Sequence, residues 1–168
     1  GALTGTPGDA DVASFTNIVI SITDAAGASA SLADFKITVH NINDAPTISG
    51  TPTTTISEES HYSFTVTASD QDAGETSSLL FHIDNKPAWA SFDGLTGTLS
   101  GSLDDQHIGT YSNIIISVFD INGASAQLAP FSITVNNFND TPQVSANAVT
   151  AVDQGVFYQL TPSVSDED

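Results

Sequence analysis

The chain has 168 residues, of which 39% are hydrophobic and only 13% are charged, a composition too apolar for a disordered polypeptide. Its charge is one-sided, because 20 Asp and Glu residues face two basic residues, Lys36 and Lys86, and the formal net charge is -18. Phosphate binding needs Lys and Arg, so the composition excludes nucleic acid as a partner and favours divalent cations; the absence of Cys excludes disulfides and Cys-based zinc sites.

The predicted elements are strands and hairpins in every segment that shows a pattern. "YSFTVTAS" at 62–69 alternates polar and apolar residues and is rich in β-branched and aromatic side chains. The turn-dense "FDGLTGTLSG" at 92–101 predicts a hairpin. "SNIIISVFD" at 112–120 and "FSITVNN" at 131–137 are strand-like, and between them the Asn-Gly pair within 121–125 is a strong hairpin signal. No segment shows a sustained helical period.

A long internal repeat organises the chain. When the sequence is shifted by 96 residues, residues 1–50 align with 97–146 without a gap and 24 of the 50 positions are identical. The same shift places 57–72 over 153–168. Such a period is longer than the ~20–50 residues of solenoid units, so it indicates tandem duplication of a whole domain.

The repeat predicts three domain segments. They are the C-terminal half of repeat 1 (1–46), a complete repeat 2 (47–142) and the N-terminal quarter of repeat 3 (143–168). Because the sequence begins inside the pattern, we expect it to be a slice of a longer chain. Short strands at regular spacing predict an antiparallel β-sandwich for each repeat. The side chains expected in the core or edge packing of repeat 2 are Trp89, Phe92, Tyr111, Ile115 and Phe131.

Three motifs resemble cadherin repeats. "TGTLSGSLDDQ", "SVFDINGAS" and "ITVNNFNDTP" follow one another in the order found in that family. The stretch "NKPAWASFDGLTGTLSGS" at 85–102 resembles the dystroglycan-type cadherin-like domain, an Ig-like family of bacterial surface and secreted proteins. The resemblance implies an all-β fold of tandem Ig-like/cadherin-like antiparallel β-sandwiches with the 96-residue period.

Acidic and amide side chains gather where the repeats join. Asp70 and Asp72 are two apart on an expected strand, so they point to the same face, and Asp166 and Asp168 repeat the arrangement. The "NINDAP" and "NFNDTP" linkers add Asn and Asp oxygens ahead of these pairs. Calcium takes six to eight oxygen ligands in irregular geometry, so the pattern favours Ca²⁺.

The cadherin resemblance implies a ligand set for each junction, with one or two calcium ions at each. At the junction of repeats 1 and 2 the ligands carried over are Asn41, Asn43, Asp44, Asp70, Asp72 and Asp120. At the junction of repeats 2 and 3 they are Asn137, Asn139, Asp140, Asp104, Gln106, either Glu58 or Glu59, Asp166 and Asp168. Asp9 and Asp11 lie beside Gly8 and Ala10, which occupy the first junction's equivalents of Asp104 and Gln106.

These observations favour a calcium-stiffened spacer or adhesion module of a large extracellular or cell-surface protein, secreted by a bacterium. The alternative is a binding module for polysaccharide or another cell-surface protein, which a row of exposed aromatic residues would favour. We expect no enzymatic activity, because no catalytic constellation is present. We expect Trp89 in the core rather than on a sugar-binding surface. We expect neighbouring repeats of the same chain as partners. We also expect head-to-tail self-association of this fragment, in which residues 155–165 add to residues 1–5 or their neighbours in another copy.

Overall fold

The computed structural model describes residues 1–72 and 74–166, and within these residues the chain is built of strands, loops and three short 3-10 turns. No helix in this part of the chain is long and apolar enough to cross a bilayer. The all-β prediction is therefore confirmed.

The chain divides into two compact units, each assembled from three segments. The first unit comprises Gly1–Ile48, Ala68–Leu80 and Ser117–Gln127. The second unit comprises Ser49–Thr67, Phe81–Ile116 and Leu128–Asp168.

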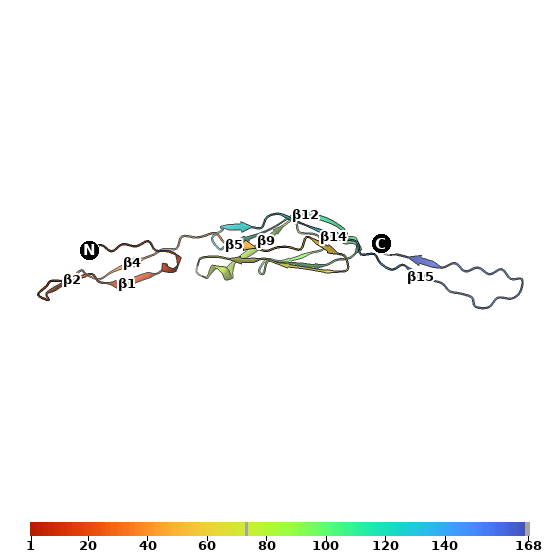
Figure 1. The fold of residues 1–168 in the computed structure, drawn as a ribbon, viewed down its shortest axis with the longest axis horizontal. Coiled ribbons are helices and arrows are strands. Elements are labelled where there is room, and N and C mark those ends of the chain that lie inside the picture. Colours follow the sequence, from red (N-terminus) through yellow and green to blue (C-terminus); the bar gives the residue numbers. More distant parts are fainter. Residues whose placement is uncertain (73, 167–168) are drawn as a thin grey trace. The chain divides into compact units, whose positions relative to one another are not determined.

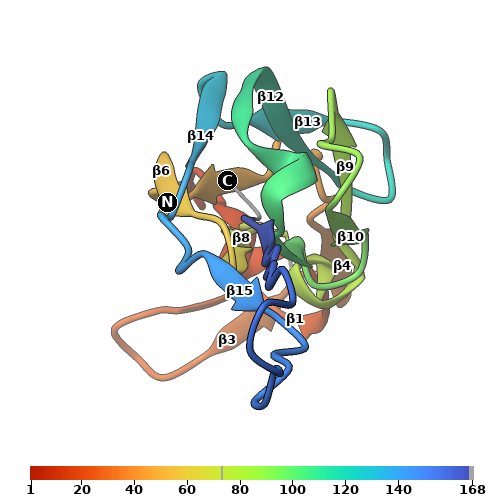
Figure 2. The same ribbon diagram turned by 90° about the vertical axis from the view of Figure 1, so that its right-hand side faces the viewer.

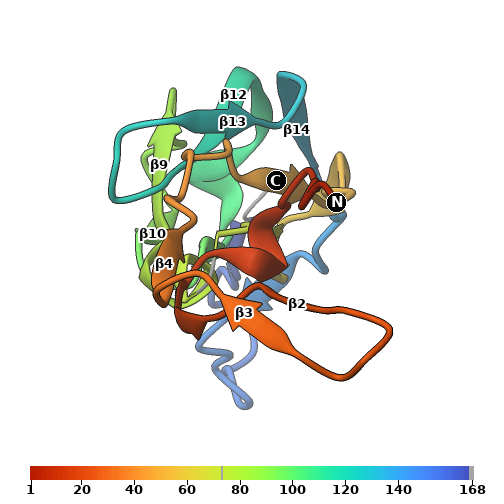
Figure 3. The same ribbon diagram turned by 90° about the vertical axis from the view of Figure 1, so that its left-hand side faces the viewer.

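Short antiparallel pairs make up the first unit. Its strands are β1 (Ser14–Ile18), β2 (Ser21–Thr23), β3 (Ser29–Ser31), β4 (Phe35–Thr38), most of β5 (Thr47–Ser49) and β8 (Thr67–Ser69), the end of β12 (Gly109–Phe119), and β13 (Ser125–Gln127). β1 pairs with β4, and β2 with β3, in the N-terminal part of the ribbon (Figures 1 and 3). β5 pairs with β8, and β12 with β13. The 3-10 turns η1 (Asp9–Asp11) and η2 (Glu75–Ser78) complete the unit.

Two sheets face each other in the second unit. Its strands are β6 (Thr55–Ser57), β7 (His61–Thr65), β9 (Leu80–Asp84), β10 (Ser91–Asp93), β11 (Thr98–Ser102), most of β12, β14 (Phe131–Asn136), β15 (Gln143–Ser145) and β16 (Ser163–Ser165), with the turn η3 (Asp105–His107). One sheet has the order β10-β11-β7, and the other runs β13-β12-β14-β6 with β9 also paired to β12. The rings of Phe64 and Phe131, one from each sheet, meet edge to face at 6.1 Å, so the sheets form a sandwich.

The predicted hairpins are present, and one further strand pairing was not predicted. β10 and β11 form the hairpin expected at 92–101, and β12 and β13 form the one expected at Asn-Gly. β6 and β14, side by side in Figure 2, pair in parallel, with Thr134 opposite Thr55. The pairs β1–β4, β2–β3, β7–β11, β10–β11, β12–β13, β12–β14 and β15–β16 are antiparallel, so the parallel pair departs from their scheme.

The core of the second unit follows from the alternation of β7. Tyr62 and Phe64 of β7 are buried, as are Leu99 of the paired strand β11 and Ile114 and Ile133 of the other sheet. Complete burial of an aliphatic side chain of this size contributes about 1.5–3 kcal/mol. The predicted residues Trp89, Phe92, Tyr111, Ile115 and Phe131 are partly buried around this core.

Strand pairs that lie 96 residues apart in the sequence have the same register but different burial. Phe15 lies opposite Ile37 in β1 and β4, and Tyr111 lies opposite Ile133 in β12 and β14. Ile133 is completely buried, whereas the equivalent Ile37 is 40% exposed. Strand pairing therefore forms without the second sheet, but the core does not.

Gly101 lies where the backbone of Trp89 packs closely against β11. A Cβ atom at Gly101 would lie 2.7 Å from the carbonyl oxygen of Trp89, so only glycine fits there. The equivalent Gly5 has no heavy atom within 4 Å of that position. The same residue is therefore obligatory in one copy and unconstrained by neighbours in the other.

Candidate metal centres

Several carboxylate and amide side chains of the first unit converge into one group, which we call cluster A. Its members are Asn43, Asp44, Asp70, Asp72, Glu75, Asp120 and Asn122. Three short segments supply them: the loop between β4 and β5, the chain that follows β8 into η2, and the turn between β12 and β13. β8 and β12 are both paired with other strands, so this pairing fixes the position of the side chains that follow them.

Three carboxylates lie at the centre of cluster A. One oxygen each from Asp70, Asp72 and Glu75 lie within 4.8 Å of one another. Asp72 is only 3% exposed. Among the described residues, Asp70 Oδ2 and Asp72 Oδ1 are buried without a hydrogen-bond partner. Buried carboxylate oxygens without donors are costly, so this arrangement suits a cation.

The loop between β4 and β5 is attached directly to these carboxylates. The Asp44 backbone N–H donates to Asp72 Oδ2 at 2.9 Å. The Asn43 side chain donates to Asp120 Oδ2 at 2.8 Å and accepts a hydrogen bond from Asn122. These contacts tie residues 43–44 to segments that lie 28 to 79 positions away in the sequence.

Electrostatic repulsion is concentrated in cluster A. Burial raises the pKa of Asp44, and the nearby carboxylates of Asp9, Asp72 and Asp70 raise it further. Burial also raises the pKa of Glu75, as does Asp72, while a hydrogen bond from Asn122 opposes the shift. The structure thus holds these acids closer together than their charges favour.

Asp120 is the exception, because donors surround it. The hydrogen bond from Asn43 lowers the pKa of Asp120 most, and the backbone N–H groups of residues 122–124 lower it further against the effect of burial. Asp24, 96 residues earlier, makes the same two backbone contacts, accepting from Ala26 and Ala28. Asp120 therefore stabilises its own turn through Oδ1 and joins cluster A through Oδ2, which accepts from Asn43.

A pocket adjoins cluster A. It is lined by Asp9, Ala10, Val12, Asn41, Asp72 and Glu75. It places Asn41 beside two of the central carboxylates. All six ligands that the sequence predicted for this junction thus lie in or next to cluster A.

A second group, cluster B, lies in the second unit and centres on Glu58. Its members are Glu58, Asp105, Asn139, Asp140 and Asp166. Glu58 is 2% exposed, and its Oε1 accepts a hydrogen bond from the Phe138 backbone N–H at 2.7 Å. That bond lowers the pKa of Glu58, but burial and the carboxylates of Asp105 and Asp140 outweigh it, so the pKa is raised.

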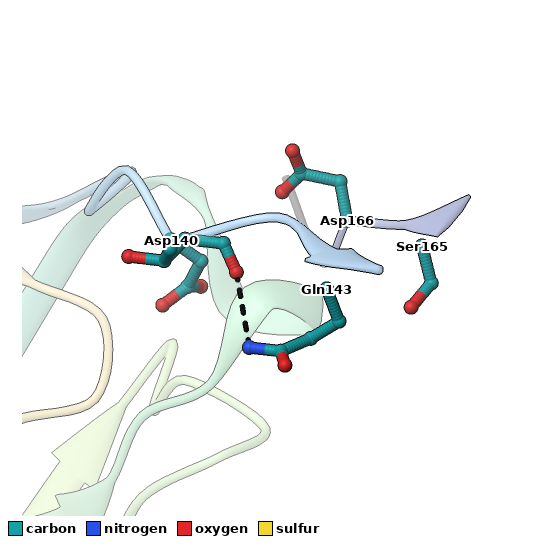
Figure 4. Close-up of a pocket in the computed structure, with 5 residues that line it drawn as sticks. Asp140, Gln143, Ser165 and Asp166 are labelled. Atoms are coloured by element: carbon teal, nitrogen blue, oxygen red, sulfur yellow. Dashed lines mark hydrogen bonds between the residues drawn. The ribbon is translucent and has the colours of Figure 1, made fainter. Parts of the chain in front are cut away.

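Asp140 connects Glu58 to the last part of the chain. Asp140 and Asp166 line one pocket together with Thr141, Gln143 and Ser165 (Figure 4). The Asn139 side chain donates to the carbonyl oxygen of Asp140 at 2.9 Å, as Asn43 does to that of Asp44 at the same distance. Asp168, also predicted as a ligand, lies outside the described residues.

The remaining residues predicted for the second junction have other surroundings. Asp104 caps η3, accepting from the Gln106 backbone N–H and lying 2.8 Å from His107 Nδ1. Gln106 and Asn137 are exposed. Glu59 is exposed with φ of 58°, and its backbone N–H donates to Leu103. Of the two glutamates left open by the sequence, Glu58 is the one in cluster B.

Three residues of the clusters were not predicted from the sequence. Glu75 follows Asp72 by three positions, and its place in η2 turns it back toward Asp70 and Asp72. Asn122 belongs to the predicted Asn-Gly turn, and its side chain reaches Glu75 at 3.1 Å. Asp105 faces Glu58, whereas its predicted neighbour Asp104 caps the turn. The sequence signal for Glu75 was an Asp-x-Asp-x-x-Glu spacing.

The comparisons with known proteins concern the family and the fold. Residues 45–136 match the family model described as "Putative Ig domain". Mouse cadherin-23 EC22-24 has a similar structure with a TM-score of 0.53 and 19% identity, covering 92% of this chain and 54% of that one. The extracellular cadherin domains 1-5 of protocadherin gamma B2 give 0.50 and 21%, covering 89% and 31%. The chain thus spans about a third to a half of these proteins. The search of curated proteins finds no match.

Proposed function

The chain belongs to the Putative Ig domain family, and from this premise we propose that it is a structural spacer or adhesion module stiffened by calcium at clusters A and B. The proposal includes the organisation suggested by the sequence. Residues 1–46, 47–142 and 143–168 are consecutive cadherin-like repeats of the dystroglycan type, joined by the "NINDAP" and "NFNDTP" linkers.

The buried oxygens of cluster A carry the calcium proposal. Asp70 Oδ2 and Asp72 Oδ1 have no hydrogen-bond donor among the described residues, and Glu75 lies within 4.8 Å of both carboxylates. The chain offers only two lysines to balance 20 acids. Oxygen-only ligands in irregular positions suit calcium better than magnesium, which needs near-ideal octahedral geometry.

The linker contacts give calcium a mechanical role. Asp44 and Asn43 belong to the loop between β4 and β5, while their partners Asp72 and Asp120 follow strands further along the chain. Burial and then repulsion between carboxylates raise the pKa of Asp44 and Glu75, and an ion held by Asp70, Asp72 and Glu75 compensates that repulsion. Calcium therefore strengthens the attachment of the linker to both strands.

Cluster B is the corresponding site at the next linker. Asp105 and Asp140 lie close enough to Glu58 to raise its pKa, and Asp140 shares a pocket with Asp166. Repetition of a calcium site at each linker is the arrangement expected of an extended stalk. We place that stalk outside the cell, on the surface of a bacterium or secreted from it, where millimolar calcium suits weak sites.

The structural role is favoured over the polysaccharide-binding alternative by the position of Trp89. Its ring meets Tyr62 at 5.7 Å and Tyr111 at 5.8 Å, both edge to face. A tryptophan engaged by two neighbouring rings offers little free face for stacking on a sugar.

The test is thermal unfolding of the full chain with calcium, magnesium or EDTA. Affinities of ~10⁻⁴–10⁻³ M are usual for extracellular modules. At about 100 times the Kd, calcium should stabilise the protein by about 2.7 kcal/mol for one site. Magnesium should do much less. Asp72→Asn should remove about half of this calcium effect, and Asp34→Asn, on an exposed residue outside both clusters, should leave it intact. Equal stabilisation by both metals would contradict the proposal.

A further inference from the structure

One asparagine of cluster A lies in a sequence that favours a covalent change. Asn122 precedes Gly123, and of the ten asparagines in the sequence it is the only one followed by glycine. It belongs to the turn between β12 and β13, and its side chain takes part in cluster A. The chemistry of the Asn-Gly pair therefore bears directly on a candidate metal centre.

The Asn-Gly pair holds a nucleophile next to an amide. The backbone nitrogen of Gly123 and the side-chain carbonyl carbon of Asn122 can close a succinimide ring, so the reaction is intramolecular. Gly123 has no Cβ to shield its nitrogen, and no heavy atom lies within 4 Å of where a Cβ would stand. Its N–H donates to the Asp120 carbonyl oxygen at 3.4 Å, which is longer than the usual range. The nitrogen is therefore accessible, and its proton is weakly held.

We propose that Asn122 is a deamidation site at which the chain adds a carboxylate to cluster A. The Gly123 nitrogen bonds to the Asn122 side-chain carbonyl carbon, the bond from that carbon to Nδ2 breaks, and ammonia leaves with the N–H proton. Both residues are exposed, so water reaches the ring. Water opens the succinimide at either carbonyl carbon and gives aspartate or isoaspartate. One ammonia is lost and one water is gained, with no oxidant or reductant.

The intact amide of Asn122 joins two other members of cluster A. Its Nδ2 donates to Glu75 Oε1 at 3.1 Å and also to Asn43 Oδ1. An ionised carboxylate has no proton to donate, so deamidation removes both hydrogen bonds. It also places a second carboxylate opposite that of Glu75. The linker that contains Asn43 therefore loses one of its attachments.

Cluster A is poorly suited to a further negative charge when no cation is bound. Burial and the neighbouring carboxylates, Asp72 foremost, raise the pKa of Glu75, and the hydrogen bond from Asn122 opposes that shift. Deamidation replaces this opposing contact with a further repulsion. The attachment of residues 43–44 to cluster A should therefore loosen in the metal-free protein.

Ageing of the full chain in EDTA, followed by peptide mapping with mass spectrometry, tests the modification. Isoaspartate should form first at position 122, and its rate should rise with pH because the attacking nitrogen must lose its proton. Asn147 precedes Ala148 and is the internal control. It should react about tenfold more slowly, since the Cβ of Ala148 shields the attacking nitrogen. No isoaspartate at position 122, or faster reaction at Asn147, would overturn the proposal.

Three variants test the consequence for cluster A. Asn122→Asp imitates the aspartate product, and Asn122→Ala removes the same hydrogen bonds without adding a charge. Ala26→Asp adds the charge at the equivalent position 96 residues earlier, outside cluster A. In low-salt EDTA the Asp44 amide hydrogen should exchange about two- to fivefold faster in Asn122→Asp than in Asn122→Ala, the effect of one exposed charge pair. Added salt should shrink this difference by screening. Ala26→Asp should exchange like the unchanged chain.

Both tests are run without calcium, so their outcome does not depend on the calcium proposal. Equal exchange at Asp44 in Asn122→Asp and Asn122→Ala would overturn the claimed effect on cluster A, as would a difference that persists in high salt. The same acceleration in Ala26→Asp would assign the effect to net charge and would also overturn it.

Discussion

Clusters A and B differ in the burial of the chain that supplies their Asp-x-Asp carboxylates. Asp70 and Asp72 of cluster A follow β8, and Asp72 is buried and tied to Asp44. Asp166 of cluster B follows β16, whose three residues are all exposed. β16 occupies the positions of β8 shifted by 96 residues, so the two strands have equivalent sequences. A converged acidic cluster therefore needs carboxylates at the right spacing and packing that holds them together.

The same contrast appears between the central strands and their N-terminal copies. Val118 in β12 is fully buried, and the equivalent Ile22 in β2 is 72% exposed, although both lie opposite an alanine in the same register. Backbone pairing between neighbouring strands is local and forms even where no second sheet packs on them. Burial depends on the second sheet, and the acidic clusters depend on burial.

The largest expected effect concerns two isoleucines that lie 96 residues apart, the buried Ile133 and the partly exposed Ile37. Ile133→Ala should lower the free energy of unfolding by about 2–5 kcal/mol, because it opens a cavity in the core. Ile37→Ala, at the equivalent position, should cost less than about 1 kcal/mol because its side chain is already partly solvated. Urea denaturation of each variant measures the difference, and equal costs would contradict the contrast in burial.

The second prediction separates the clusters by calcium affinity. Asp72→Asn should weaken calcium binding about tenfold, or about 1.4 kcal/mol, because it removes a buried charge from the central group. Asp166→Asn should change only the weaker class of sites. Calorimetric titration of the two variants should therefore show opposite losses. Loss of the tighter class on Asp166→Asn would reverse the order of the clusters.

A matched pair of turn residues isolates the contribution of cluster A. Asp120→Asn and Asp24→Asn remove the same charge from turns with the same hydrogen bonds, but only Asp120 also accepts from Asn43. Calcium affinity should fall about threefold in the first variant and stay unchanged in the second, since ligand charge sets the affinity of such sites. An equal loss in both would assign the effect to turn stability.

The smallest expected effect is on the pH dependence of stability. Asp44, Glu58 and Glu75 have raised pKa values when folded, so the folded protein binds protons more tightly than the unfolded chain. In EDTA the melting temperature should therefore rise slightly as the pH falls from 7 toward ~4, the usual carboxyl range. The lowered pKa of Asp120 acts in the opposite sense, and the stability that it contributes is lost only as the pH falls below that range.

Calcium should reverse this trend, because protons then compete with the ion for the same oxygens. With saturating calcium the melting temperature should fall over the same pH interval. Parallel pH curves with and without calcium would mean that the perturbed carboxylates do not bind the ion.

Much of the fold was predictable because its signals are local. Alternation at 62–69 identified β7, and Asn-Gly at 122–123 identified the turn between β12 and β13. The parallel pairing of β6 with β14 was not predicted, because it joins segments about 80 residues apart through backbone groups that carry no pattern.

The sequence predicted which segments supply the candidate sites, but not which way the individual side chains point. The spacing predicted that Asp70 and Asp72 lie together on a strand; the structure brings their oxygens within 4.8 Å of each other, but after the end of β8 rather than on a strand. The spacing could not show that Asp104 caps η3 while Asp105 turns toward Glu58, because a one-residue difference in a tight turn reverses the side chains. Glu75 was missed for the same reason, since η2 folds it back onto Asp72.

Amide hydrogen exchange with and without calcium tests the central claim most directly. Calcium at cluster A should slow exchange at residues 41–46 and 70–72, which include the Asp44 N–H that donates to Asp72. The turn at residues 24–28 has the hydrogen bonds of the turn at 120–124 without the cluster and serves as an internal control. Protection at 41–46, 70–72 and the 120–124 turn, with none at the 24–28 turn, is the predicted result. Unchanged exchange at 41–46 and 70–72 in millimolar calcium would contradict the account.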